Sequence, residues 1–301
     1  MSFLTTLING ISLGSMYALI ALGYTMVYGI AKMLNFAHGD VIMIGGITTL
    51  TVMQKITASF AISEVTAAII SLLIAVIVCT VLGITVEKVA YKPLRQASSL
   101  AVLITAIGVS YFLQNTALLT FGSKKEMITF KFLDALSIKV NDELTIHGAT
   151  IVNVVTMVVI MIALVLFINF TKAGTAMRAV SEDNGAAQLM GINVNKTIAL
   201  TFAIGSGLAA VAGVLLCSSY PSLSPYTGSM PGIKAFVAAV FGGIGSIPGA
   251  LVGGILLGVI EILSKYYISS QLSDAIVFGM LIIVLLLKPT GIFGKKIQEK
   301  V

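Results

Sequence analysis

Residues 1–31 of this chain read MSFLTTLINGISLGSMYALIALGYTMVYGIA, a run without a single charged side chain. A helix needs about 20 mostly apolar residues to cross the hydrocarbon core of a bilayer, and this run exceeds that length. It lacks the basic start of a secretory signal peptide, and it is longer than the roughly 7–15 apolar residues of one. We therefore expect residues 1–31 to be retained as a membrane-spanning helix.

The rest of the chain has the same apolar character. Hydrophobic residues make up 57% of the 301 residues and charged residues only 10%, whereas about a quarter of the residues of a soluble domain are charged. Seven further runs are free of charge, except for Asp274 in the last: 41–54, 65–86, 96–123, 144–171, 197–233, 235–260 and 266–287. The sequence predicts an all-α polytopic membrane protein of about eight transmembrane segments, forming a single domain over residues 1–301.

Two of these runs contain residues that interrupt helices. Run 197–233 is longer than one crossing, and its second half is expected to be a loop at a membrane face because it holds Pro221, Pro225 and Pro231. Run 235–260 predicts a re-entrant or discontinuous segment, with a break between two short helices at Gly242, Gly243, Gly245, Pro248 and Gly249. Irregular backbone at membrane depth must be packed inside protein or line a watery cavity. Tight helix packing without a transport role explains the same small residues, so both interpretations stay open.

Basic residues indicate which segments face the cytoplasm, because cytoplasmic loops are enriched in Lys and Arg. We expect two segments there: the linker with Lys88, Lys92 and Arg95, and the tail with Lys288, Lys295, Lys296 and Lys300. The loop at about 122–149 mixes both charge signs. Counting crossings back from the tail makes this loop external, provided that the glycine-broken segment enters and leaves on one face. Its stretch 130–144 alternates enough to predict a small hairpin.

Several function classes are excluded by what the sequence lacks. The net charge of +6 arises from basic clusters between long uncharged runs, which is typical of a membrane protein and not of a nucleic-acid-binding one. No phosphate-cradling glycine loop is present, so this chain is expected to bind no nucleotide cofactor, and an ATP-driven process would use a partner subunit. His38, Asp40 and the distant His147 are too few for a metal site, and no nucleophile-and-base signature indicates an enzyme.

Residues 32–40, KMLNFAHGD, are a polar stretch between two apolar runs. Burying Asn35, His38 and Asp40 in lipid is expensive, so they should face water, the bundle interior or one another. We predict that they form a hydrogen-bonded turn inside the bundle. The alternative is an ordinary helix start, with Asp40 as the N-cap and Asn35 as a turn residue.

Residues 172–194, KAGTAMRAVSEDNGAAQLMGINV, predict a short amphipathic helix between two spans. Residues 181–184 can cap it, Gly191 suits its C-terminal end, and its apolar face would hold Met177, Val180, Leu189 and Met190. Such a helix docks on another protein or lies on lipid. Docking is favoured because anionic headgroups would repel Glu182 and Asp183.

Isolated charges stand near the apolar runs at Lys55, Lys234, Glu261 and Asp274. Ionisable residues within a membrane are candidate functional residues. Lysines near helix ends, however, extend their ammonium groups toward the interface. Glu261 follows 26 uncharged residues, and we expect it to mark a helix end.

Four stretches resemble the integral-membrane permeases of branched-chain amino acid ABC importers, the LivH-like family. They are INGISLGSMYAL at 8–19, LNFAHGD at 34–40, residues 177–194 and AFVAAVFGGIGSIPGA at 235–250. The resemblance implies a permease subunit in the cell inner membrane that carries leucine, isoleucine or valine. The partners that it implies are two ATPase subunits, which use the ATP, a second related permease and a soluble substrate-binding protein that largely sets selectivity.

The resemblance also implies that the cytoplasmic loop at about 172–194 is the coupling helix, which sits in a cleft of the ATPase. The importer pattern Glu-Ala-Ala-x-x-x-Gly is matched by Ala186, Ala187 and Gly191, while Gly185 stands at the Glu position. The acidic contact would then fall to Glu182 or Asp183, near Arg178.

Other functions remain as alternatives. Relatives with the same permease pattern carry other amino acids or small amides such as urea. A stand-alone channel or ion-coupled carrier would need intramembrane carboxylates as ion sites, and this sequence has few. A membrane scaffold would leave transport independent of the chain.

Overall fold

The computed structural model describes residues 3–60, 62–123, 126–127, 130–141 and 144–294. Within this part, seven helices are long and apolar enough to cross a membrane, and two shorter apolar helices accompany them. The long helices are α1 (Phe3–Ala31), α2 (His38–Ser59), α3 (Glu64–Val86), α4 (Ser99–Phe121), α5 (Gly148–Phe170), α8 (Val194–Ser219) and α10 (Ile247–Tyr267), and the short ones are α9 (Ser229–Gly242) and α11 (Ser273–Leu287). The prediction of an all-α polytopic membrane protein is confirmed.

Helix α1 lies at the centre of the bundle, with residues 12–27 all buried. It packs against α10 through small residues. A Cβ added to Gly254 would stand 2.4 Å from the Cα of Ala18, and one added to Gly258 would stand 2.2 Å from the backbone N of Gly14. Small residues that let backbones approach this closely are how membrane helices associate.

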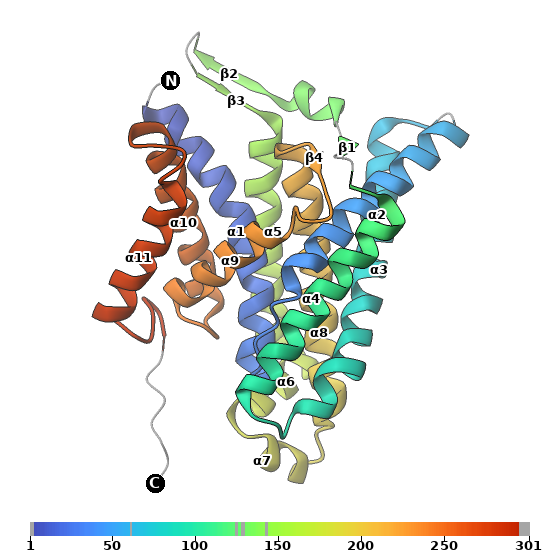
Figure 1. Ribbon diagram of the computed structural model, residues 1–301, viewed down its shortest axis with the longest axis vertical. Helices are drawn as coiled ribbons and strands as arrows, with labels where there is room; N and C mark the ends of the chain where they lie inside the picture. The colour runs from blue at the N-terminus through green and yellow to red at the C-terminus, as the bar shows by residue number, and fades with distance from the viewer. Residues whose placement is uncertain (1–2, 61, 124–125, 128–129, 142–143, 295–301) are drawn as a thin grey trace.

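One end of the bundle carries the strands (Figure 1). The 3-10 helix η3 (Lys131–Leu136) leads into an antiparallel hairpin of β2 (Ile138–Asn141) and β3 (Leu144–Ile146). The predicted hairpin is therefore confirmed, although η3 takes the first part of the predicted stretch. β1 (Glu126–Met127) pairs with β4 (Ser222–Leu223), which ties the loop after α4 to the loop after α8.

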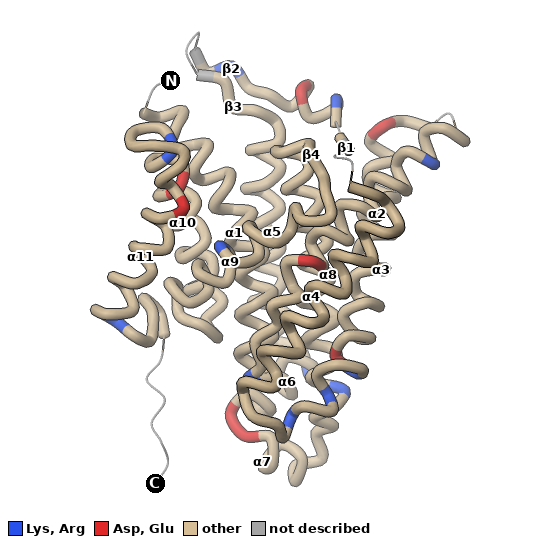
Figure 2. The backbone as a smooth tube through the Cα atoms, in the orientation of Figure 1, with Lys and Arg blue, Asp and Glu red and all other residues tan. Residues whose placement is uncertain are grey.

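The opposite end carries short helices and many of the basic residues (Figure 2). Helix α3 continues there as a π-helix, η1 (Glu87–Tyr91), and a 3-10 turn, η2 (Lys92–Leu94). Helices α6 (Lys172–Glu182) and α7 (Asn184–Leu189) lie at the same end (Figure 1). The linker expected in the cytoplasm and the expected coupling loop thus share one end. Of the tail lysines, Lys295, Lys296 and Lys300 lie outside the described residues.

The proline-rich and glycine-rich runs are both interrupted, but over fewer residues than predicted. Pro231 lies in α9, Pro248 and Gly249 lie in α10, and α10 is long enough to cross a membrane and is not the short helix that was expected. Helix α8 ends at Ser219, and residues 220–228 form a loop that contains β4. Helix α9 ends at Gly242 and α10 begins at Ile247, so residues 243–246 form the glycine break. The chain comes down from β4, turns at this break and returns through α10 toward the strand-bearing end (Figure 1).

Several helix boundaries differ from the charge-free runs. Helix α2 begins at His38 and continues through Lys55, whose side chain is exposed. Helix α10 continues through Glu261 to its end at Tyr267, and α11 begins only at Ser273. The length of an uncharged run does not give the helix boundaries here, because a helix continues through a charged residue whose side chain is solvated or paired.

Candidate functional site

Residues 32–37 interrupt the path from α1 to α2. Lys32 adopts the left-handed conformation, with φ of 55°, which is uncommon for a residue other than glycine. Asn35 is buried, and its Oδ1 accepts a hydrogen bond of 2.9 Å from the hydroxyl of Tyr91 in η1. The backbone oxygen of Asn35 accepts from the backbone N–H of His38 at 3.1 Å. The interrupted segment is therefore fixed to the end of α3.

His38 opens α2 and is 1% exposed. Its ring lies 4.6 Å from the ring of Tyr24 in α1. Gly23 makes room for it, because a Cβ there would stand 2.5 Å from the His38 Nε2. Within the described part of the chain, this Nε2 has no hydrogen-bond partner. Buried polar atoms are nearly always paired, so His38 is a position of functional interest.

Asp40 lies in the first turn of α2 and is 2% exposed. Its Oδ1 accepts a hydrogen bond of 2.8 Å from the amide of Gln114 in α4, and the same amide donates to Ser229 of α9 at 3.2 Å. The N-cap position belongs to Ala37, which makes no side-chain cap bond, so the interpretation of Asp40 as an N-cap is wrong. The side chains of Asn35, His38 and Asp40 reach η1, α1 and α4 respectively and form a junction between helices.

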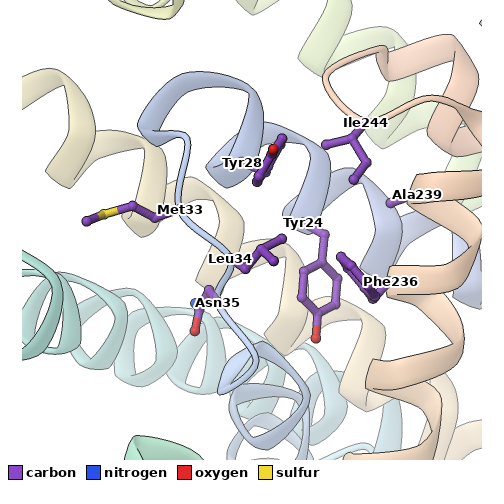
Figure 3. A pocket seen from close by; sticks show the side chains of 8 residues that line it. All are labelled: Tyr24, Tyr28, Met33, Leu34, Asn35, Phe236, Ala239 and Ile244. Carbon is purple, nitrogen blue, oxygen red and sulfur yellow. The ribbon is translucent and has the colours of Figure 1, made fainter. Parts of the chain in front are cut away.

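Figure 3 shows the interrupted segment beside the glycine break. Both line a small cavity of about 10 Å³ together with α1 and α9, and its walls are Tyr24, Tyr28, Met33, Leu34, Asn35, Phe236, Ala239 and Ile244. This volume is at the lower limit for one water, so the segments pack almost without a void. The Phe236 ring lies 5.4 Å from that of Phe36 and 5.8 Å from that of Tyr24.

The glycine break is closed by backbone contact at its two edges. A Cβ on Gly242 would lie 1.9 Å from the carbonyl oxygen of Gly249, which leaves no room for any side chain. Pro248 stands in the first turn of α10, where its missing N–H leaves no hydrogen bond unmade. These residues let α9 turn sharply into α10.

Inside the break, two glycines have backbone conformations that side chains disfavour. The φ angles are 105° at Gly243 and 92° at Gly245. A Cβ on Gly243 would also stand 2.5 Å from the backbone N of Gly294, whereas one on Gly245 would meet only Gly29, at 3.9 Å. The two predicted positions thus differ: Gly243 is constrained by packing and conformation, and Gly245 by conformation alone.

Residues 172–194 form two capped helices and not the single helix that was predicted. The carboxylate of Asp183 starts α7 by accepting hydrogen bonds from the backbone N–H of Gly185 at 2.8 Å and of Ala186 at 3.0 Å. Gly191 ends it in the left-handed conformation, with φ of 81°. The N–H of Ile192 then donates to the carbonyl of Ala187 at 3.0 Å, a bond typical of glycine-terminated helices.

The prediction of one apolar face on this segment is wrong. Met177 and Val180 of α6 are buried in the bundle, whereas Leu189 is 90% and Met190 82% exposed. The reason is the extended backbone of Asp183 (φ −156°, ψ 115°), which ends α6 and starts α7 as a separate helix. Leu189 and Met190 are therefore exposed at the surface of the chain instead of packing with Met177 and Val180.

The other predicted coupling residues divide between buried and exposed positions. Ala187 is buried, whereas Ala186, Glu182 and Arg178 are exposed. Arg178 makes a long hydrogen bond of 3.4 Å to the carbonyl of Asn169 at the end of α5. Within this chain, only Ala187 of these four is constrained by packing.

A chain of polar contacts links the start of α8, which follows α7, to the buried junction. Asn195 accepts a hydrogen bond of 2.5 Å from Arg95, and Arg95 pairs with the buried carboxylate of Glu87. Glu87 shares the π-helix η1 with Tyr91, the partner of Asn35. π-Helices are rare and often occur at functional sites. No local sequence signal indicated this one.

Three of the four isolated charges meet in space. The Nζ of Lys234 lies 2.7 Å from both the Glu261 and the Asp274 carboxylate. Glu261 is 1% exposed and also accepts from the hydroxyl of Tyr17 at 2.8 Å and from Lys265 at 2.5 Å. The expectations that Glu261 marks a helix end and that lysines extend toward the interface are wrong for this pair, because Glu261 lies within α10 and Lys234 is buried in α9.

Lys234, Glu261 and Lys265 line a cavity of about 210 Å³ between α1, α8, α9 and α10, whereas Asp274 is not part of its lining. Tyr220, just past the end of α8, also lines it. Burial and the nearby Glu261 carboxylate raise the pKa of Tyr220, so its hydroxyl stays protonated at neutral pH. Among the described residues, no group of three or more His, Cys, Asp or Glu side chains could hold a metal ion.

Comparison with known proteins covers nearly the whole chain. Residues 6–285 match the family described as the permease component of the branched-chain amino acid transport system. The high-affinity branched-chain amino acid transport system permease protein LivH of Salmonella typhimurium is 46% identical, and that of Escherichia coli K12 is 44% identical. The corresponding protein BraD of Pseudomonas aeruginosa is 46% identical. Each match covers 99% of this chain and 98% of the relative.

Proposed function

Because the chain belongs to the family of branched-chain amino acid ABC transporter permeases, we propose that it forms one side of the translocation path of an importer for leucine, isoleucine and valine. A second related permease completes the path, a soluble binding protein delivers the substrate, and two ATPase subunits hydrolyse the ATP. The main support for this proposal is the similarity of the chain, over its full length, to high-affinity permeases of this transport system.

The orientation that we propose places α6 and α7 in the cytoplasm. The linker between α3 and α4 holds Lys88, Lys92 and Arg95, and its Arg95 bonds to Asn195 at the start of α8, just after α7. Cytoplasmic loops are enriched in such basic residues. The strand-bearing loop at about 122–149 is then external. It stands on the side from which a binding protein approaches.

The surface that meets the ATPase is the outer side of α7. Leu189 and Met190 are exposed there beside Ala186, on the helix that lies farthest out at this end (Figure 1). Adjacent exposed apolar side chains on a small rigid helix are suited to a partner surface. Lipid is the poorer partner because Glu182 and Asp183 stand nearby and anionic headgroups would repel them.

Movement of α7 reaches the membrane interior through α8 and η1. The Ile192–Ala187 backbone bond joins α7 to the segment that begins α8. The contacts from Asn195 through Arg95 and Glu87 lead to the π-helix, and Tyr91 leads on to Asn35. The chain performs no covalent chemistry. Instead, it switches between two conformations that open the translocation path to opposite sides of the membrane.

Uptake by the reconstituted transporter tests this function. The chain is assembled with its partner permease, ATPases and binding protein in proteoliposomes, and accumulation of labelled leucine is followed with and without ATP. We expect ATP-dependent accumulation that isoleucine and valine compete away and urea does not. Leucine uptake without ATP, or accumulation of urea alone, contradicts the proposal.

A further inference from the structure

Four charged side chains from α9, α10 and α11 form a network without net charge. Lys234 and Lys265 supply the ammonium groups, and Glu261 and Asp274 supply the carboxylates. Such a network adds little to folding, because removing the charges from water costs about as much as their attraction returns. Because folding stability does not explain their presence, ionisable groups inside a membrane bundle are candidates for a functional role.

The network borders a cavity that can hold a small solute. The volume of about 210 Å³ far exceeds the roughly 10–15 Å³ that one water requires on the same measure. Lys234, Glu261 and Lys265 contribute to its polar wall, and Leu13, Leu216 and Met230 contribute to its apolar wall. A lining that contains both charged and aliphatic side chains suits a molecule with a charged end and an aliphatic end.

The cavity is accessible from the strand-bearing end of the bundle. Met230 is 44% exposed, and the Lys265 side chain is 36% exposed. Helix α10 ends and α11 begins near that end (Figure 1). In the orientation proposed above, a solute released by the binding protein reaches this cavity first.

We propose that the cavity is a docking site for a zwitterionic aliphatic amino acid, which inserts between Lys265 and Glu261. Its carboxylate binds the Lys265 ammonium, its ammonium group binds the Glu261 carboxylate, and its side chain lies against Leu13, Leu216 and Met230. Lys234 stays between Glu261 and Asp274. The inference rests on the proposed function and names where the substrate docks in this chain.

Charge balance is the reason for choosing a zwitterion. The network is neutral before insertion, and a zwitterion leaves it neutral with every charge paired. An anion or a cation would give the network a net charge beside the buried Glu261 and Lys234, which is unfavourable. A neutral amide would separate Lys265 from Glu261 without replacing either charge.

Protection of a cysteine from labelling tests the site in the complete transporter. Met230→Cys is introduced at the cavity, and its reaction with a membrane-impermeant thiol reagent is measured in proteoliposomes. The native Cys79 and Cys217 are buried. We expect leucine to slow the reaction, whereas 4-methylpentanoate and isopentylamine, which each lack one charge, do not. Tyr226→Cys is the control, because Tyr226 is 55% exposed and does not line the cavity.

Substitution of Lys265 distinguishes leucine binding in the cavity from an indirect effect of leucine on the labelling of Met230→Cys. In the Met230→Cys background, Lys265→Met should raise the half-protecting leucine concentration about tenfold or more, since a hydrogen bond to a charged group is lost. Lys265→Arg should keep protection within a few fold, and Lys55→Met, at an exposed lysine of α2, should not change it. Equal labelling with and without leucine, undiminished protection in Lys265→Met, or no labelling in either nucleotide state overturns the inference.

Leucine uptake by the same proteoliposomes distinguishes the two proposals. If the wild-type transporter carries no leucine, the proposed function fails. If it carries leucine but leucine does not protect Met230→Cys, the function stands and only the docking site fails.

Discussion

Buried polar side chains that join different helices set the interior geometry of this bundle. Asn35 is held by Tyr91, Asp40 by Gln114, and Lys234 by Glu261. Each pair satisfies groups that would otherwise be costly to bury in a membrane protein. Removing one partner should therefore cost more than the bond itself contributes.

Tyr91→Phe tests the link between the π-helix and the interrupted segment. The change keeps the ring, which packs 5.2 Å from that of Phe202, but leaves the Asn35 oxygen without its donor. We expect destabilisation of about 1–3 kcal/mol, measured as a lower thermal midpoint in detergent, and weaker coupling of ATP hydrolysis to uptake. Tyr111→Phe, at an exposed tyrosine of α4, is the control, and equal effects of both changes would argue against a specific link.

The positions of individual polar and charged side chains could be predicted only in part. Asn35, His38 and Asp40 were expected inside the bundle because burial in lipid is expensive, and the structure buries all three. The convergence of Tyr17, Lys234 and Glu261 was not foreseen. Tyr17 and Glu261 are 244 residues apart, and no local pattern states which distant charges will pair.

At the scale of elements, glycines decide where helices approach, turn and end. Close approach is required at the α1–α10 crossing, a turn at residues 243–246, and a left-handed end at Gly191. Glycine meets all three needs, because it lacks a Cβ and adopts positive φ without strain. Glycine is required for a different reason at each site, so its substitution should have a different effect at each.

Gly191→Leu tests the end of α7. Nothing lies within 4 Å of a Cβ at this position, so any defect comes from the φ of 81° and not from a clash within the chain. Strain of about 1–3 kcal/mol should loosen the α7 end, measured as faster amide exchange at Ile192 and weaker association with the ATPase. Gly191→Asn, which tolerates this conformation, should retain most of both. A loss as large with Asn as with Leu would mean that conformation is not the cause.

Gly254→Val tests the α1–α10 crossing. A Cβ there would stand 2.4 Å from the backbone of Ala18, so the two helices must separate. We expect a loss of at least about 1–3 kcal/mol, measured as reduced yield of folded protein and a lower thermal midpoint. Gly108→Val in α4, where nothing lies within 4 Å, should fold normally. Normal folding of Gly254→Val would show that the crossing is not tightly packed.

The elements were more predictable than the contacts between them. Uncharged length predicted the spans, and clusters of proline and glycine predicted the loop after α8 and the break before α10. The π-helix η1 and the separation of α6 from α7 were missed. The π-helix involves a tertiary contact, of Tyr91 with Asn35, which local propensity does not contain. The α6–α7 separation is made by a local cap, the carboxylate of Asp183 on the N–H groups of Gly185 and Ala186, and the capping residues at 181–184 were placed on one helix instead of between two.

At the scale of the whole molecule, we propose that the two ends have different tasks. In the proposed orientation, one end would present the strands and the charged cavity to the substrate side, and the other would present α7 to the ATPase. Two irregular segments, residues 32–37 and 243–246, lie beside each other across α1 (Figure 3).

The central claim is that a partner ATPase drives this permease through the outer side of α7. The most direct measurement is leucine accumulated per ATP hydrolysed by reconstituted transporter carrying Leu189→Ser and Met190→Ser, compared with wild type. Both side chains are exposed, so the variant should insert and fold normally. The predicted result is loss of ATPase copurification, or hydrolysis that no longer drives uptake. Copurification and ATP-driven leucine uptake at wild-type levels would contradict the claim.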